Sequence, residues 1–143
     1  MKSDYIVAVH SLVYLYHHGG CVLSSEELAT NVCTNAARVR KVMAKLKKMG
    51  AVTTREGHVG GYCACPQVGK LDLASIAKGM DTVFVEVQWH SGSQELHCMI
   101  SNGMAQIFND IYANLDAKCK QELTKLTIAD LDKKIFKGKK SKK

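Results

Sequence analysis

Residues 31–50 read NVCTNAARVRKVMAKLKKMG, and this stretch decides the fold. Apolar side chains recur in it at spacings of three and four residues, which predicts a helix that buries one face. They are Val39, Val42, Met43 and Leu46. Thr34 or Asn35 is placed to cap the start of this helix, and Gly50 is placed to end it in the left-handed conformation.

The same helix is strongly basic. Its cationic side chains fall into two rows at helical spacing: Arg38, Lys41, Lys45 and Lys48 in one, and Arg40 and Lys47 in the other. A basic helical face is usually only solvated, so the meaning of this one depends on the elements around it.

Two helices are expected before the basic helix and a hairpin after it. Residues 4–18 are apolar nearly all round, which predicts a buried first helix capped by Ser3 or Asp4. Ser24 and Glu27 fit a capping box, so a short second helix is expected to begin there. Two short strands around the glycine-rich sequence EGHVGG predict a hairpin. This order predicts a winged helix-turn-helix, in a fold that is mainly α with a small β-hairpin wing (α+β).

The second half of the chain is dominated by one long helical pattern. Before it, residues 71–81 are expected to be helical and residues 82–88 strand-like. From Met99 the apolar spacing continues for about seven turns, or ~40 Å of helix. A helix this long exceeds so small a domain, so its stripe is expected to pack against a second copy of the chain, the alternative being its own domain. The predicted dimerisation residues are Ile100, Met104, Ile107, Ile111 and Leu115.

Four parts are expected along the 143 residues. A winged helix-turn-helix domain occupies residues 1–80, a strand and a sensor loop follow at 81–98, and a dimerisation helix with a C-terminal helix spans 99–135. A basic tail, expected to be disordered, occupies 136–143. The net charge of +7 is unevenly spread, because the first part and the tail are basic and the region between them is acidic. A polyanionic partner is therefore expected for the first part.

Composition also excludes several classes of protein. No apolar run is long enough to span a membrane, and the N-terminus lacks the pattern of a signal peptide. A cytoplasmic protein whose six cysteines are reduced is therefore expected. No nucleophile motif, phosphate loop or pair of catalytic carboxylates is present, so no enzymatic activity is expected.

Taken together, the elements predict an interface for duplex DNA. The first turns of the basic helix are placed to present side chains to base edges in the major groove, with its lysines toward phosphates. The glycines of the hairpin are expected to let its backbone approach the sugar–phosphate chain. The predicted DNA-contacting residues are Ser24, Thr34, Asn35, Ala36, Arg38, Arg40, Lys41, Lys45, Arg55, His58, Gly60, Gly61 and Tyr62.

Over nearly its whole length the sequence resembles the Rrf-two family of bacterial transcription regulators. The matching segments are SDYIVAVHSLVYL, SSEELATN, RVRKVMAKLKKMGAVTTREGHVGGY, LDLASIAKGMD and LTIADL. The resemblance implies a homodimer that binds palindromic operators, in most members as a repressor. One departure lies in the wing, where the family usually has Arg directly before the glycine. Here Glu56 precedes Gly57 and Arg55 stands one place earlier, which in a strand changes the face that the side chain occupies.

A second departure concerns the sensor. Cluster-binding relatives carry three cysteines between the winged domain and the long helix, whereas this chain has Cys98 there, with His90 and His97 nearby. An iron–sulfur cluster is therefore not expected, and no metal site is predicted. The hypothesis is instead that oxidation or electrophile modification of Cys33 and Cys98 changes operator affinity. Cys33 is expected to be activated by the start of the basic helix and by Arg38; a buried structural role is the alternative.

Two other functions stay open. The chain could be a repressor that senses an iron–sulfur cluster or a small ligand, or it could be a protein-interaction module whose long helix binds another protein and not DNA. Salt dependence separates DNA binding from the module, because counterion release weakens DNA binding steeply as salt rises.

Overall fold

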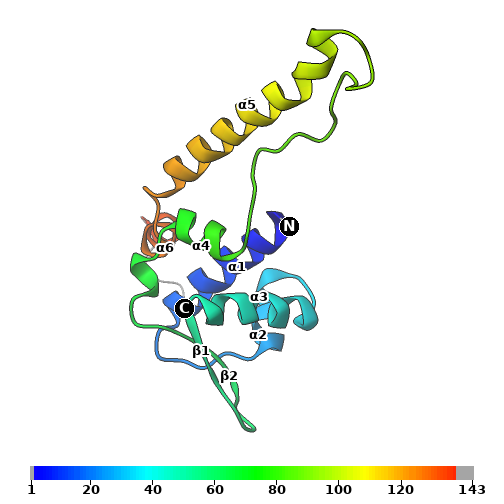
Figure 1. The fold of residues 1–143 in the computed structure, drawn as a ribbon. Helices are drawn as coiled ribbons and strands as arrows, with labels where there is room; N and C mark the ends of the chain where they lie inside the picture. The colour runs from blue at the N-terminus through cyan, green and yellow to red at the C-terminus, as the bar shows by residue number, and fades with distance from the viewer. Residues whose placement is uncertain (1, 138–143) are drawn as a thin grey trace.

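The computed structural model describes residues 2–137, which form a winged body with a long helix projecting from it (Figure 1). The elements, in chain order, are α1 (Lys2–His17), α2 (Ser25–Val32), α3 (Ala36–Lys48), β1 (Val52–Arg55), β2 (Gly61–Ala64), the 3-10 turn η1 (Val68–Lys70), α4 (Leu73–Gly79), α5 (Met99–Leu123) and α6 (Ile128–Phe136). The described part of the chain is thus mostly helical with one two-stranded antiparallel hairpin. This confirms the predicted fold class.

The core of the winged body lies between α1, α3 and α4. Leu12 of α1 and Ile76 of α4 are fully buried, as is the predicted apolar stripe of α3. The first helix begins before the predicted cap, so Asp4 lies inside its first turn and not ahead of it. Asp4 is itself buried, and its carboxylate pairs with Arg38 of α3.

Both ends of α3 follow the local sequence signals. Asn35 Oδ1 accepts the backbone N–H of Arg38 at 2.8 Å, which makes Asn35 the N-cap. At the other end Gly50 has φ of +77°, and its N–H donates to Lys47 O while the next N–H donates to Leu46 O. This is a Schellman ending, which needs a left-handed residue after the last turn and therefore favours glycine.

The wing is pinned to the start of α2. β1 pairs with β2 from Val52 opposite Ala64 to Arg55 opposite Gly61. Leu23 then exchanges two backbone hydrogen bonds with Tyr62, of 2.9 and 2.7 Å. The backbones approach so closely here that a Cβ at Gly61 would overlap the Leu23 carbonyl. Glycine is thus needed at this position for packing within the chain.

The strand predicted over residues 82–88 does not form, and this prediction is wrong. The segment runs without regular structure from α4 toward the far end of α5 (Figure 1). The N–H groups of Phe84 and Val85 donate instead to Asp116 Oδ1 of α5, at 2.7 and 3.1 Å. β-Branched composition favours a strand only where a sheet edge offers a partner, and here a helix-borne carboxylate satisfies the backbone.

The long helix α5 has 25 residues, as its spacing predicts. Asp116 is the one residue of α5 that is buried, and Ile100 in the apolar stripe is 74% exposed. Of the other stripe residues, Ile107, Ile111 and Leu115 are also exposed, while Met104 is half-buried. Within a single chain the stripe therefore packs on very little.

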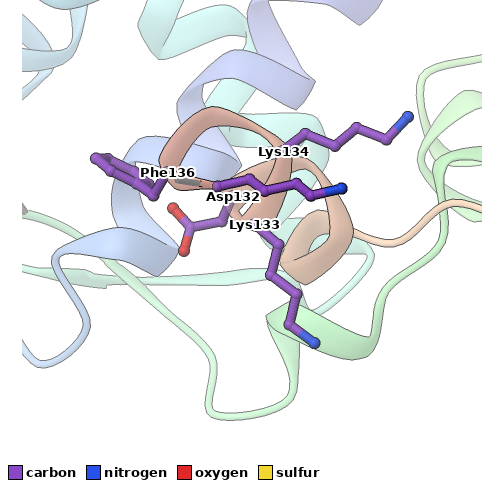
Figure 2. A pocket seen from close by; sticks show the side chains of 5 residues that line it. Asp132, Lys133, Lys134 and Phe136 are labelled. Carbon is purple, nitrogen blue, oxygen red and sulfur yellow. The ribbon is translucent and has the colours of Figure 1, made fainter. Parts of the chain in front are cut away.

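Helix α6 returns to the winged body beside α1. His17 Nδ1 lies 3.0 Å from Asp132 Oδ1, and the His17 ring stacks on Phe136 with centroids 4.2 Å apart. The side chains of Lys133 and Lys134 point away from those of Asp132 and Phe136, and all four line a hollow of about 480 Å³ (Figure 2). A wider groove of about 1140 Å³ runs between α1 and α6.

Candidate nucleic-acid interface

The outward face of α3 carries only small and basic side chains. Its exposed residues are Ala37, Arg40, Lys41, Ala44, Lys47 and Lys48. They lie opposite the buried stripe because both sets recur at three and four residues along the helix. Ala37 and Ala44 keep the centre of this face low between long cationic side chains, and α3 contains no acidic residue. Such a surface suits close approach to a groove lined by phosphates.

The basic residues of α3 differ in their contacts within the chain and in their exposure. Arg38 Nε donates to Asp4 Oδ1 at 2.8 Å, and the Arg38 side chain is 30% exposed. Lys41 Nζ lies 3.7 Å from the other oxygen of Asp4, yet the Lys41 side chain is 67% exposed. Lys45 is half-buried at the same border as Arg38. Lys41 is therefore presented to solvent, and Arg38 is engaged within the body.

Two more cations on this face contact neighbouring elements. Arg40 Nη1 donates to Ser25 Oγ at 3.2 Å and lies 3.7 Å from a carboxylate oxygen of Glu26. Lys47 Nζ donates to Thr54 Oγ1 of β1 at 3.1 Å. Arg40 thus sits toward α2 and Lys47 toward the wing, so the face of α3 is continuous with both.

Two of the predicted DNA-contacting residues, Ser24 and Asn35, use their side chains to cap helices. Ser24 Oγ accepts the N–H of Glu27 at 3.1 Å, and Glu27 Oε2 accepts the N–H of Ser24 at 2.9 Å, which confirms the capping box. Asn35 Oδ1 is likewise occupied by its own helix. Asn35 is exposed, while Thr34 and Ala36 are half-buried beside it.

The predicted residues of the wing differ in their exposure. Arg55 and His58 are exposed, in agreement with a role at a surface. Tyr62 is half-buried and packs against the core. A Cβ at Gly60 would lie 2.6 Å from the Arg55 carbonyl oxygen, so Gly60, like Gly61, is explained by packing within the chain.

Sequence reasoning missed Ala37, Ala44 and Val59. The alanines have no charge to draw attention, but a helical wheel centred opposite the buried stripe would have found them. Val59 is 81% exposed at the wing tip. Its position between the glycines of the hairpin could have indicated that it is exposed at the wing tip.

The two thiols predicted as sensors have opposite surroundings. Cys33 is exposed but caps the C-terminal end of α2, with φ of +65° and Sγ 3.7 Å from Thr30 O. The Cys33 Sγ thus lies against carbonyl oxygens at the end of α2, and activation of this thiol by the start of α3 stays a prediction. Cys98 is exposed at the N-cap of α5, where the N–H groups of Ser101 and then Ile100 lower the pKa of its thiol.

The residues around Cys98 do not fit an iron–sulfur cluster held by one chain. Across residues 2–137, no three His, Cys, Asp or Glu side chains come together as a metal ion would require. His90 lies between α4 and α5, but its Nε2 is hydrogen bonded to Asn109 Oδ1 at 2.7 Å. A cluster also needs several thiolates, and Cys98 is the only cysteine between residues 81 and 104.

The winged fold and its basic outward helix define a winged-helix transcriptional regulator as the class of protein. Residues 1–134 match the Rrf2 family, described as "Iron-dependent Transcriptional regulator". The chain therefore belongs to the Rrf2 family of DNA-binding transcriptional regulators. No curated protein matches the chain significantly. None of the helices within residues 2–137 has the length and apolar character that crossing a membrane requires.

Solved structures agree with this assignment. A candidate transcriptional regulator from Lactobacillus plantarum is 25% identical, with a TM-score of 0.85 over 96% of this chain and 93% of that one. IscR from T. potens is 16% identical, with a TM-score of 0.70 over 100% and 93%. The oxidized form of CymR from Staphylococcus aureus is 12% identical, with a TM-score of 0.64 over 90% and 92%. The last two likenesses concern the fold alone.

Proposed function

We propose that the chain is a homodimeric repressor that binds palindromic operators and changes its affinity when a thiol is oxidised. The proposed DNA binding rests mainly on one observation, the outward face of α3. This face is exposed, free of acidic residues and continuous with the wing, and the helix that carries it is capped at its start. In this proposal Lys41 and Lys48 lie over phosphates and the alanines admit the base edges.

The dimer is supported by the exposed apolar stripe of α5. Four large apolar side chains there are 44–74% exposed along a helix that keeps only Asp116 buried. An exposed stripe of this length on a projecting helix indicates a surface covered in the assembly. A twofold pair formed through α5 would place two copies of α3 at opposite ends, matching a palindrome.

The switch is proposed at Cys98, with Cys33 as a second exposed thiol. The Cys98 thiolate would attack a peroxide oxygen, giving a sulfenic acid and releasing hydroxide; a second thiol would then displace water to form a disulfide. The existence of an oxidized form of Staphylococcus aureus CymR, which shares this fold, supports this chemistry by analogy. Because Cys98 begins α5, its modification would act on the helix that joins the two copies.

Operator selection with reduced and with peroxide-treated protein tests this function. A selected palindrome bound by the reduced dimer, with affinity that falls after treatment, is the expected result. Cys98→Ser should abolish the change, whereas Cys119→Ser, which removes an exposed thiol in the last third of α5, should retain it. If Cys98→Ser responds to peroxide as the wild type does, Cys98 has no part in the switch.

Two measurements separate the other candidate functions. Steep loss of duplex binding between low and high salt is expected for the repressor, and an interaction module would bind duplex weakly at every salt concentration. An absorbance spectrum of protein purified without oxygen tests the cluster: visible iron–sulfur bands would replace the thiol switch with a cluster-sensing repressor.

A further inference from the structure

A buried carboxylate stands behind the candidate recognition helix. Asp4, in the first turn of α1, is 6% exposed and accepts the Nε–H of Arg38 at 2.8 Å. Lys41 Nζ lies 3.7 Å from its second oxygen. The Arg38 hydrogen bond and charge, followed by the charge of Lys41, hold the pKa of Asp4 below its ordinary value despite burial. Asp4 is therefore ionised at neutral pH and pairs with two cations of α3.

These two cations are engaged to different degrees. Arg38 meets Asp4 in a short, charge-assisted bond and keeps 30% of its side chain exposed. Lys41 lies farther away, and 67% of its side chain remains exposed. A phosphate would have to displace a buried carboxylate to reach Arg38 Nε, whereas Lys41 can turn toward a phosphate at little cost.

We propose that Asp4 is a positioning residue of the DNA interface, which keeps Arg38 as a brace between α1 and α3 and leaves Lys41 to neutralise phosphate. This rests on the proposed function, and it assigns opposite roles to two cations that sequence spacing places in one row.

The Asp4–Arg38 pair also lies next to the segment after α4 that is hydrogen bonded to α5. The ring of Tyr5, the residue after Asp4, meets Phe84 edge to face with centroids 5.2 Å apart. The N–H of Phe84 donates to Asp116 of α5 at 2.7 Å. Asp4 thus lies where α1 contacts both the recognition helix and the segment that α5 holds in place.

Salt dependence of binding to a random-sequence duplex tests the roles, because its slope counts the phosphates that the protein neutralises, at about 0.9 per contact in each bound unit. Fluorescence anisotropy on the full chain would compare wild type with three variants. The proposed homodimer carries two copies of each residue, so Lys41→Gln should flatten the slope by about 1.8. Arg38→Gln should leave the slope unchanged, and Asp4→Asn should steepen it by about 1.8 because Arg38 is released.

The double variant Asp4→Asn with Arg38→Gln should return the slope to that of wild type. It removes both members of the ion pair, so it remains usable if either single variant folds poorly. A purely structural Asp4 would lower affinity without changing the slope, which would overturn the proposal. If Arg38→Gln flattens the salt slope as much as Lys41→Gln does, the proposal is also overturned. The proposed DNA-binding function would still hold in that case. If wild type shows no salt-dependent binding, the proposed function itself fails.

Discussion

The winged body, comprising residues 2–80 and α6, and the helix α5 differ in how they bury apolar surface. In the winged body, Leu12, Met43 and Ile76 are completely buried within one chain. In α5, Ile100 is 74% exposed and a carboxylate is the one buried residue. The body therefore has a core within one chain, whereas the apolar stripe of α5 is left exposed by its own chain.

The largest expected effect lies in that stripe. Ile111→Asp would place two charges in the proposed twofold interface and remove two apolar side chains worth about 1.5–3 kcal/mol each when buried. The dimer dissociation constant should rise on the order of 100-fold or more. Sedimentation over a range of concentrations measures it, with Ile111→Leu as a control that keeps the apolar surface. An unchanged dissociation constant in Ile111→Asp would mean that this stripe is not the dimer contact.

The next effect belongs to the core of the winged body. Leu46 of α3 is fully buried, so Leu46→Ala should lower the free energy of unfolding by about 2–5 kcal/mol through lost burial and a residual cavity. Urea unfolding followed by circular dichroism checks this. Ala44→Ser on the exposed side of the same helix should leave stability nearly unchanged. Equal losses in the two variants would contradict the orientation of α3.

The stability that Asp116 of α5 contributes by holding the segment after α4 should depend on pH. Burial alone would raise the pKa of Asp116, but the Lys120 ion pair at 2.8 Å and the N–H groups of Phe84 and Val85 hold it below its ordinary value. Its contribution is therefore complete above the unfolded pKa near 3.8 and is lost as pH falls through the lower folded value. Asp116→Asn should reduce stability at pH 7 by roughly 1–3 kcal/mol and should flatten the acid-induced loss.

Stability measured between pH 2 and 7 compares Asp116→Asn with wild type, and Asp110→Asn, on an exposed part of α5, serves as the control. A wild-type curve that Asp116→Asn does not alter would exclude this carboxylate as the support of the segment after α4.

The smallest expected effect concerns the helix cap beside the interface. Ser24→Ala removes the acceptor for the N–H of Glu27 and should cost about 1 kcal/mol of stability. Ser24→Asp keeps an acceptor and should restore most of it. If Ser24→Ala weakens duplex binding far more than stability, Ser24 contacts DNA directly, as the sequence pattern predicts.

Sequence reasoning predicted the features that depend on nearby residues and failed on one that depends on tertiary contacts. The helix starts at Ser24 and Asn35, the end at Gly50 and the long helix from Met99 rest on side chains a few residues apart. Such spacings are set by the geometry of one element, so the sequence contains them in full. The strand over residues 82–88 failed because pairing requires an edge that local composition does not specify.

The sequence by itself determined which residues of α3 face inward, that the helix is basic, and that a hairpin follows it. Only the tertiary structure decided that Arg38 is held by Asp4, 34 positions earlier, and that Cys98 meets a helix start while Cys33 meets a helix end. The reason is physical: periodicity reports which side of an element is buried, but the charge and hydrogen-bond partners of a side chain depend on which other elements pack beside it.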